Sequence, residues 1–136
     1  MVVKWNDKYM LGIDEIDKQH KHLFEIASEV GGLTKDIGNS IDCYDEYMVI
    51  LKELIEYTIY HFDYEEKVMK ANNYNEDDFI VHQFEHKMFV KKLEKFAEED
   101  FDENQYENIN NMLEFLVNWI THHILETDIK YCGVIK

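Results

Sequence analysis

The sequence predicts an all-α protein, an antiparallel up-down-up-down four-helix bundle preceded by an N-terminal arm. Its 136 residues include no proline and only five glycines, so long stretches lack helix-breaking residues. Apolar residues recur at steps of three and four in four segments of similar length, which is the period of an amphipathic helix. Short connections between such segments favour antiparallel neighbours. We expect a single domain over residues 1–136.

The first helix is expected over residues 15–37, after an arm over residues 1–14. Its apolar stripe includes Ile16 and Leu23, and His20 lies in the same stripe. His22 lies two residues further, about 200° around a regular helix, so we expect it to face solvent. The apolar residues of the arm are expected to pack across the bundle: Trp5, Tyr9, Met10 and Leu11.

The second helix is expected over residues 44–70 and the third over residues 76–99. The stripe of the second helix carries His61 and Glu65, one turn apart. The stripe of the third carries His82 and His86, again one turn apart. Side chains four residues apart on a helix project from the same face, so each pair can bind a common centre.

The fourth helix is expected over residues 104–128, with His123 on its apolar stripe. Asp128 follows His123 by five residues, an offset of about 140° on a regular helix, so spacing alone does not select it. On geometry alone, Glu126 could be the inward-facing carboxylate instead of Asp128. Asp128 could reach the same centre if the last turn of the helix loosens. His122 lies at the edge of the stripe, and we expect it at the surface or in a supporting position behind the inward-facing histidines.

Five histidines and a glutamate therefore fall on core stripes: His20, His61, Glu65, His82, His86 and His123. Burying an unpaired polar group costs a few kcal/mol, so these side chains need partners. A single buried histidine is usually a hydrogen-bonded core residue. Five imidazoles and one carboxylate cannot easily satisfy one another, and a metal ion is the partner that satisfies them all.

Composition excludes other classes of partner. The formal net charge of -15 repels nucleic acid and anionic membrane surfaces. No stretch approaches the roughly 18 apolar residues of a membrane span, and the first residues lack a signal-peptide pattern, so we expect a cytoplasmic protein. Cys43 and Cys132 are far apart and outside any CxxC motif, so we expect free thiols.

Several runs of residues resemble the hemerythrin family, and most closely its bacterial single-domain members, the bacteriohemerythrins. The resemblance extends over nearly the whole chain. The matching residues are Gly12, Ile13, Asp14, Ile16, Asp17, Gln19, His20, Leu23, Phe24, His61, Phe62, Glu65, Glu66, His82, His86, Trp119, His123, Asp128, Lys130 and Tyr131.

The resemblance implies a centre of two iron ions joined by a bridging oxo or hydroxo group. It assigns three histidines to one iron: His82, His86 and His123. It assigns His20 and His61 to the other iron, with Glu65 and Asp128 as bridges. Asp128 is thus selected by analogy.

The expected function is reversible dioxygen binding for transport, storage or delivery, without catalysis. Two six-coordinate irons offer about twelve positions, of which these ligands fill about eleven, leaving room for one diatomic ligand. Oxidising di-iron bundles use more carboxylates and fewer histidines. By resemblance, dioxygen binds at the iron held by His20 and His61. The same resemblance gives the pocket its apolar wall: Leu23, Phe62, Trp119, Ile120 and Ile124.

Two other functions use the same centre. One is a di-iron enzyme that detoxifies peroxide or nitric oxide or oxidises iron. The other is an oxygen or redox sensor acting through a separate partner protein. A carrier would also need an oxygen-accepting protein, which the sequence does not identify.

Overall fold

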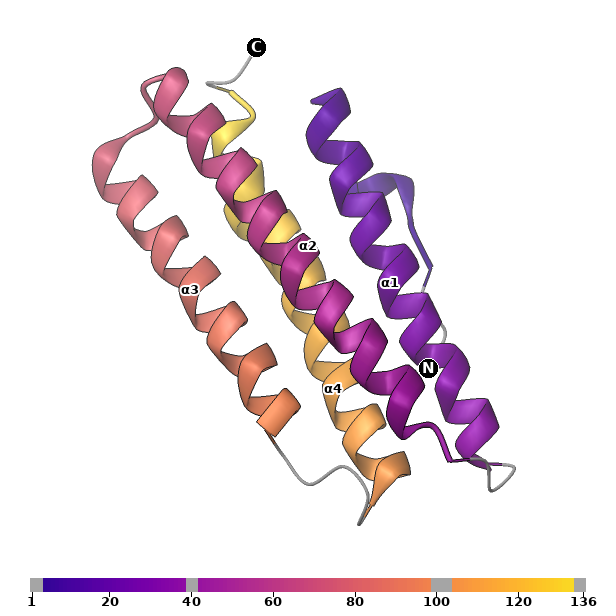
Figure 1. The fold of residues 1–136 in the computed structure, drawn as a ribbon. Coiled ribbons are helices and arrows are strands. Elements are labelled where there is room, and N and C mark those ends of the chain that lie inside the picture. Colours follow the sequence, from indigo (N-terminus) through magenta and orange to yellow (C-terminus); the bar gives the residue numbers. More distant parts are fainter. Residues whose placement is uncertain (1–3, 39–41, 99–103, 134–136) are drawn as a thin grey trace.

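The computed structural model describes residues 4–38, 42–98 and 104–133. Four long helices, α1 (Asp14–Gly38), α2 (Tyr44–Ala71), α3 (Glu76–Glu98) and α4 (Gln105–His122), alternate in direction along one bundle (Figure 1). The described ranges contain helices, turns and loops without a strand. The prediction of an all-α four-helix bundle is confirmed. Residues 1–3 of the expected arm and residue 99, the expected end of the third helix, lie outside the described residues.

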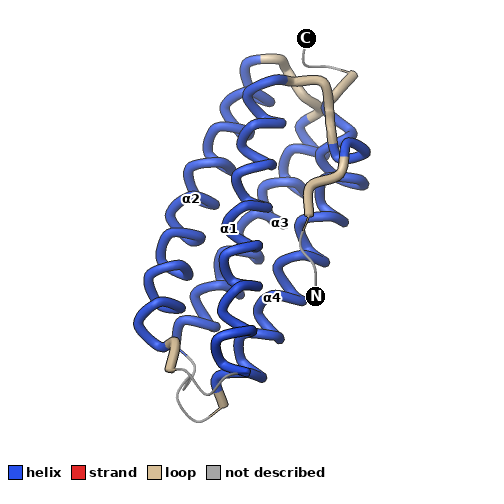
Figure 2. The backbone as a smooth tube through the Cα atoms, turned by 90° about the vertical axis from the view of Figure 1, so that its right-hand side faces the viewer, coloured by secondary structure: helices blue, strands red, loops and turns tan. Residues whose placement is uncertain are grey.

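Each helix packs against neighbours on two sides. α1 contacts α2 and α4, and α3 contacts the same two helices from the other side, so α1 and α3 lie diagonally opposite (Figure 2). Side chains from all four helices therefore converge on one central axis. Within the described ranges, no helix combines the length and apolar character needed to cross a membrane.

The core is divided along this axis by a polar layer. A large apolar cluster fills the part of the bundle that contains Leu54, Leu93 and Leu116. A smaller cluster around Ile16 and Met69 lies towards the other end of α1 and α2. On α1, His20 falls between Ile16 of the smaller cluster and Leu23 of the larger one; on α3, His82 and His86 fall between Phe79 and Phe89 in the same way. The histidines and carboxylates thus occupy a layer enclosed by apolar side chains on both sides.

The N-terminal arm packs against α1 through its aromatic residues. Tyr9 is buried and stacks on Phe24 with ring centroids 5.1 Å apart, while Trp5 meets the same ring edge-on at 5.4 Å. Leu11 is partly buried against the core. Met10 is 44% exposed, so the expectation that it packs across the bundle is wrong. The arm forms a 3₁₀ turn, Asp7–Tyr9, that ends at Met10 in an extended conformation, and Tyr9 and Leu11 on either side of Met10 take the inward positions.

A buried carboxylate fixes the junction between the arm and α1. Asp17 accepts hydrogen bonds from the backbone N–H of Leu11 at 2.7 Å and of Gly12 at 3.0 Å. Gly12 has a φ of 85°, in the left-handed region that favours glycine. The arm therefore meets the helix at a defined angle, close to the turn that carries His20.

The fourth helix does not continue regularly to residue 128. α4 ends at His122 and is followed by a π-helical turn, His123–Thr127, and a 3₁₀ turn, Asp128–Tyr131. The backbone N–H of Asp128 donates to the carbonyl of His123, a hydrogen bond that spans five residues instead of four. The wider turn brings the fifth residue back to the face of the first. Such π-bulges are frequent at functional sites.

Leu54 offers a test of the apolar cluster away from the polar layer. Leu54→Ala should lower the free energy of unfolding by about 2–5 kcal/mol, because the side chain is 0% exposed and leaves a cavity. Val49→Ala, on the same helix but 67% exposed, should change it by less than about 0.5 kcal/mol. Chemical denaturation of the metal-loaded protein measures both. Similar losses for the two variants would contradict this placement of the core.

Candidate metal centre

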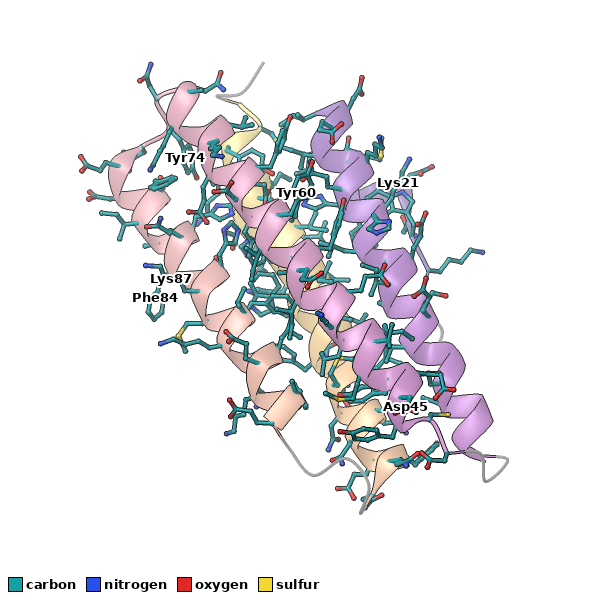
Figure 3. The ribbon with its side chains drawn as sticks, viewed as in Figure 1. Lys21, Asp45, Tyr60, Tyr74, Phe84 and Lys87 are labelled. Atoms are coloured by element: carbon teal, nitrogen blue, oxygen red, sulfur yellow. The ribbon has the colours of Figure 1, made fainter. Side chains whose placement is uncertain are left out.

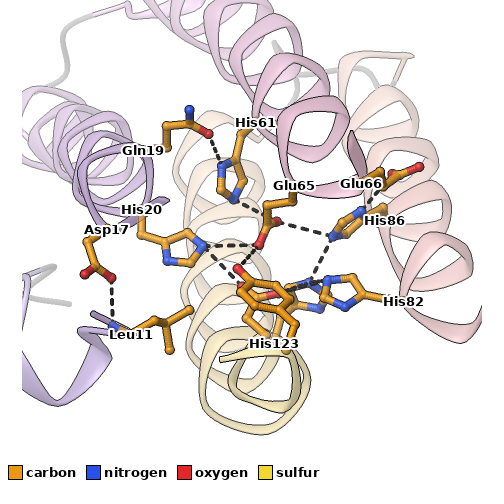
Figure 4. A network of polar contacts seen from close by, with 12 residues as sticks. Leu11, Asp17, Gln19, His20, His61, Glu65, Glu66, His82, His86 and His123 are labelled. Atoms are coloured by element: carbon orange, nitrogen blue, oxygen red, sulfur yellow. Dashed lines mark hydrogen bonds and ion pairs between the residues drawn. The ribbon is translucent and has the colours of Figure 1, made fainter. Parts of the chain in front are cut away.

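The structure brings all seven sequence-predicted ligands into one buried layer. Figure 4 shows Glu65 and the five histidines of this layer converging. None is more than 4% exposed. α1 contributes one residue, α2 and α3 contribute two each, and the turns after α4 contribute the last two: His20, His61, Glu65, His82, His86, His123 and Asp128.

Three histidines form one half of this cluster. The Nε2 atom of His123 lies 3.1 Å from Nε2 of His86 and 3.1 Å from Nε2 of His82. Oδ1 of Asp128 lies 2.9 Å from Nε2 of both His82 and His123. A shared proton can satisfy one of these nitrogen pairs, whereas a metal ion can accept all three lone pairs.

The spacing of these donors fits an octahedral ion. Donors about 2.1 Å from such an ion lie about 3.0 Å from their neighbours, which is √2 times the bond length. The nitrogen–nitrogen and nitrogen–oxygen separations in this half are 2.9–3.1 Å. The donor atoms of the three-histidine half are therefore arranged as cis ligands of one metal would be.

The other half contains His20 and His61. Nε2 of His61 lies 3.0 Å from Oε1 of Glu65, and Nε2 of His20 lies 3.1 Å from Oδ2 of Asp128. Asp128 thus directs one oxygen to each half. Glu65 also faces both, because its Oε1 lies 3.5 Å from Nε2 of His86. The two carboxylates connect a group of three histidines with a group of two.

Several buried atoms of the layer have no hydrogen-bond partner of acceptable geometry. They include both oxygens of Asp128, Oε1 of Glu65 and both ring nitrogens of His20. Leaving buried polar atoms unpaired is costly, and most proteins avoid it. Apart from Nδ1 of His20, these orphaned atoms face the cluster and are the donors that metal ions would use, so the residues present fit a metal centre.

Three histidines are oriented from behind by polar side chains. Nδ1 of His61 bonds to Gln19 at 2.7 Å, and Nδ1 of His86 bonds to Glu66 at 3.0 Å. Nδ1 of His123 lies 3.4 Å from Glu85. With its outer nitrogen so engaged, each ring directs Nε2 inwards, the usual arrangement around metal-binding histidines.

Sequence reasoning missed this supporting layer. Gln19 and Glu66 each precede or follow a candidate ligand, but adjacency in a helix does not bring side chains to the same face. Glu85 likewise precedes His86, yet it lies behind His123 in the turn after α4, a pairing that periodicity does not reveal. The only feature of the sequence that points to these supporting side chains is their position next to a candidate ligand: Gln19 beside His20, Glu66 beside Glu65 and Glu85 beside His86.

Tyr131 ties the end of the chain to the cluster. It is fully buried, its hydroxyl donates to Oε2 of Glu65, and its ring lies nearly parallel to His82 at 5.8 Å. Burial and the charge of Glu65 hold the pKa of Tyr131 well above its usual value, so the hydroxyl keeps its proton. The 3₁₀ turn after Asp128 is thereby fixed against α2.

The charges of the layer depend on one another. Burial and Asp128 would raise the pKa of Glu65, but the nearby imidazoles, His61 foremost, outweigh them and lower this pKa to about 2. Burial disfavours a charged His123, yet Asp128 raises the pKa of this histidine to about 10. The carboxylates are thus ionised and ready to bind a cation.

The structure also separates the ligand candidates from their neighbours. The Glu126 side chain is 64% exposed and pairs with the exposed His122 at 2.8 Å, so both lie outside the cluster. His22 is partly exposed and pairs with Glu25, as expected for a surface histidine. The π-helical turn is the physical reason that Asp128 faces inwards instead of Glu126.

The five residues expected to wall a ligand pocket all belong to the large apolar cluster. Leu23, Phe62, Ile120 and Ile124 are buried, and Trp119 is partly buried. Two of them cover the three-histidine half: the Phe62 ring stacks on His86 at 3.7 Å, and the Trp119 ring stacks on His123 at 4.3 Å.

An antiparallel helical bundle with histidines and carboxylates converging from every helix defines a metal-binding bundle protein. Residues 11–133 match the family model of the hemerythrin HHE cation binding domain. The chain belongs to the hemerythrin family, and we describe it as a hemerythrin-type metal-binding protein.

Individual relatives agree with this assignment. A bacteriohemerythrin of Clostridium acetobutylicum is 42% identical over 127 residues, covering 93% of this chain and 96% of that protein. A hemerythrin-like protein of Naegleria gruberi is 26% identical over 132 residues, covering 96% of this chain and 92% of that protein. A bacteriohemerythrin of Stenotrophomonas maltophilia is 29% identical over 75 residues, 52% of this chain and 42% of that protein.

Asp128 and Glu126 provide a matched test of the ligand set. Asp128→Asn should lose at least one metal ion per chain, because a neutral amide replaces a carboxylate that faces both histidine groups. Glu126→Gln, the same change at the exposed position, should keep the full metal content. Elemental analysis after reconstitution measures the ratio of metal to protein. Loss of metal in the Glu126 variant alone would show that the turn is placed incorrectly.

Metal binding should release protons. Asp128 holds the pKa of His123 at about 10 in the metal-free protein, so this imidazole is protonated at neutral pH and must lose its proton to become a ligand. The metal affinity should therefore rise with pH from neutral towards about pH 10. Anaerobic calorimetry with ferrous iron in two buffers of different ionisation enthalpy measures the release. Equal heats in both buffers would contradict it.

Proposed function

We propose that this protein binds two iron ions and uses them to bind dioxygen reversibly. The proposed ligands of one iron are His82, His86 and His123. The proposed ligands of the other are His20 and His61. Glu65 and Asp128 would bridge the two irons, together with an oxo or hydroxo group. The observation that carries the proposal is the division of the buried histidines into groups of three and two joined by carboxylates.

The donor chemistry supports iron. Imidazole and carboxylate suit iron, whereas zinc sites are usually satisfied by four tetrahedral ligands. Five imidazoles with two carboxylates exceed what one zinc ion requires. When bound, ferrous iron supplies the electrons that make dioxygen binding favourable, which no side chain of the chain can supply.

The unequal histidine groups support a single ligand site. With the carboxylates shared, the half that contains His20 and His61 has one imidazole fewer, so the vacant position falls there. The side chains named for the pocket wall are apolar: Leu23, Phe62, Trp119, Ile120 and Ile124. Their role is to keep water and protons away from the ligand, which favours release over further reaction.

A carrier is favoured over a di-iron enzyme by the residues around the layer. Gln19 and Glu66 are hydrogen-bonded to the backs of His61 and His86, and Glu85 lies 3.4 Å from Nδ1 of His123. All three lie on the outer side of the rings, away from the proposed irons, so none is placed to act as an acid or base on a ligand bound there. A sensor acting through another protein would use the same centre, and an oxygen-accepting protein would be needed for delivery.

The experiment that tests the proposal is an optical titration of the anaerobically reduced, iron-loaded protein with dioxygen, alongside an iron count. We expect two irons per chain and a visible charge-transfer band that appears with dioxygen and disappears when it is removed. A band that decays to the ferric form with release of peroxide would favour the enzyme. Fewer than two irons would refute the proposed centre.

Ile120 tests the apolar wall. Ile120→Ala should admit water and speed the loss of the oxygenated form by about tenfold, which corresponds to about 1.4 kcal/mol of barrier height. Leu116→Ala, one turn further from the centre in the same helix, creates a similar core cavity and should change this rate by less than about twofold. Decay of the oxygenated band in air-saturated buffer measures both. Equal rates would remove the special role of Ile120.

A further inference from the structure

The outer face of α3 carries an exposed apolar and basic surface. Phe84 is 61% exposed and Met88 is 47% exposed, and both point away from the bundle core. Lys87, Lys91 and Lys95 are exposed on the following turns. Figure 3 shows Phe84 and Lys87 projecting outwards from this helix. We call these five residues the α3 strip.

The charge of this strip is opposite to that of the whole chain. Between His86 and Phe96 there are four lysines and one glutamate, whereas the protein carries a formal charge of -15. The lysines are Lys87, Lys91, Lys92 and Lys95, and all four are exposed. At physiological ionic strength charges are screened beyond about 8 Å, so a docked partner responds mainly to this local charge.

A groove beside the strip leads to the proposed metal centre. It lies between α2 and α3, has a volume of about 380 Å³, and Lys87, Lys91, Phe62 and His86 are among its lining residues. The His86 ring, a proposed iron ligand, stacks on Phe62 at 3.7 Å. One lining side chain therefore separates the outside of the bundle from the metal.

Three carboxylates also line the groove, Asp63, Glu66 and Glu94, and Glu94 is exposed among the lysines of α3. Asp63 pairs with Lys67 at 3.0 Å, and Glu66 accepts from Gln83 at 2.9 Å and contacts Nδ1 of His86 at 3.0 Å. These contacts hold both acids at the groove wall. The lysines of α3 remain directed towards solvent.

We propose that the α3 strip is the docking site of a small acidic iron–sulfur protein that transfers electrons to the centre through His86. The inference rests on the proposed di-iron function, because only ferrous iron binds dioxygen and any ferric centre must be reduced. Each encounter oxidises one carrier and reduces one iron from ferric to ferrous. Two encounters restore the pair, and no covalent bond forms between the proteins.

The chemistry of the strip fits this partner. Electron-transfer complexes are small and short-lived, and complementary charges raise their association rate more than their affinity. Two apolar side chains flanked by lysines suit such a contact. Iron–sulfur proteins of the plant ferredoxin type have low reduction potentials, which suit the reduction of ferric iron bound by histidine and carboxylate.

A second face was weighed against this one. On α1 and α2, a groove lined by Lys18, Lys21, Tyr57 and Tyr60 also includes Gln19, which bonds to His61. None of the proposed iron ligands is among its lining residues, whereas His86 lines the groove beside α3. Gln19 also stands between this groove and the histidine. This face therefore serves as the control.

The test measures reduction of the ferric, iron-loaded protein by a reduced plant-type [2Fe–2S] ferredoxin in stopped flow. Lys87→Glu with Lys91→Glu should lower the second-order rate constant by at least tenfold. Lys91→Glu with Lys95→Glu leaves Lys87, the neighbour of His86, unchanged. This variant should also lower the second-order rate constant several-fold. Lys18→Glu with Lys21→Glu, which changes the net charge equally, should lower it less than about twofold. Reduction by dithionite should stay within about twofold in all variants.

Binding is measured independently by amide NMR. Addition of oxidised ferredoxin should shift the signals of Phe84, Met88 and Lys91 in the wild type and leave them unshifted in the Lys87/Lys91 variant. Equal slowing of the α1 and α3 variants, or shifts confined to the α1 and α2 face, would overturn the proposal. So would a wild type that holds two irons and binds dioxygen yet is not reduced by ferredoxin. A wild type without two irons would instead refute the proposed function.

Discussion

The structure depends on one constraint, the satisfaction of five imidazoles and two carboxylates in a layer that is almost closed to water. No pairing among them meets the requirement, since three Nε2 atoms lie 3.1 Å apart in succession and both oxygens of Asp128 lack a hydrogen bond. A cation satisfies them together. The apolar clusters on either side then supply the burial that holds four helices around it, so stability and metal binding are coupled.

The supporting contacts follow from the same constraint. A histidine that binds metal through Nε2 must present Nδ1 to a partner, and Gln19, Glu66 and Glu85 fill that place for three of the five rings. Two of these partners are carboxylates and both stand behind the three-histidine half. This half is therefore more negative than the half where His61 is backed by an amide. The two halves therefore differ both in the number of histidines and in the charge of the side chains behind them.

Function is divided between the interior and the surface. In the proposed function, the interior provides the metal ligands and the apolar walls around a small neutral ligand. The surface carries the groove and the lysines of α3. The same helix contributes two histidines, His82 and His86, to the three-histidine half. His86 belongs to both regions, because its Nε2 faces the cluster while its ring lines the groove.

The sequence by itself determined the bundle and most of the layer, because the 3.6-residue period places His20, His61 and His82 on core stripes. It also located the helices α1 to α3 closely. It could not select Asp128, since a regular helix turns this residue away. The π-helical turn that returns it is a local departure from the 3.6-residue period. The carboxylate of Glu85 behind His123 and the contact of Tyr131 with Glu65 arise only where separate segments meet. Periodicity reports one helix at a time, and these contacts depend on how the helices pack.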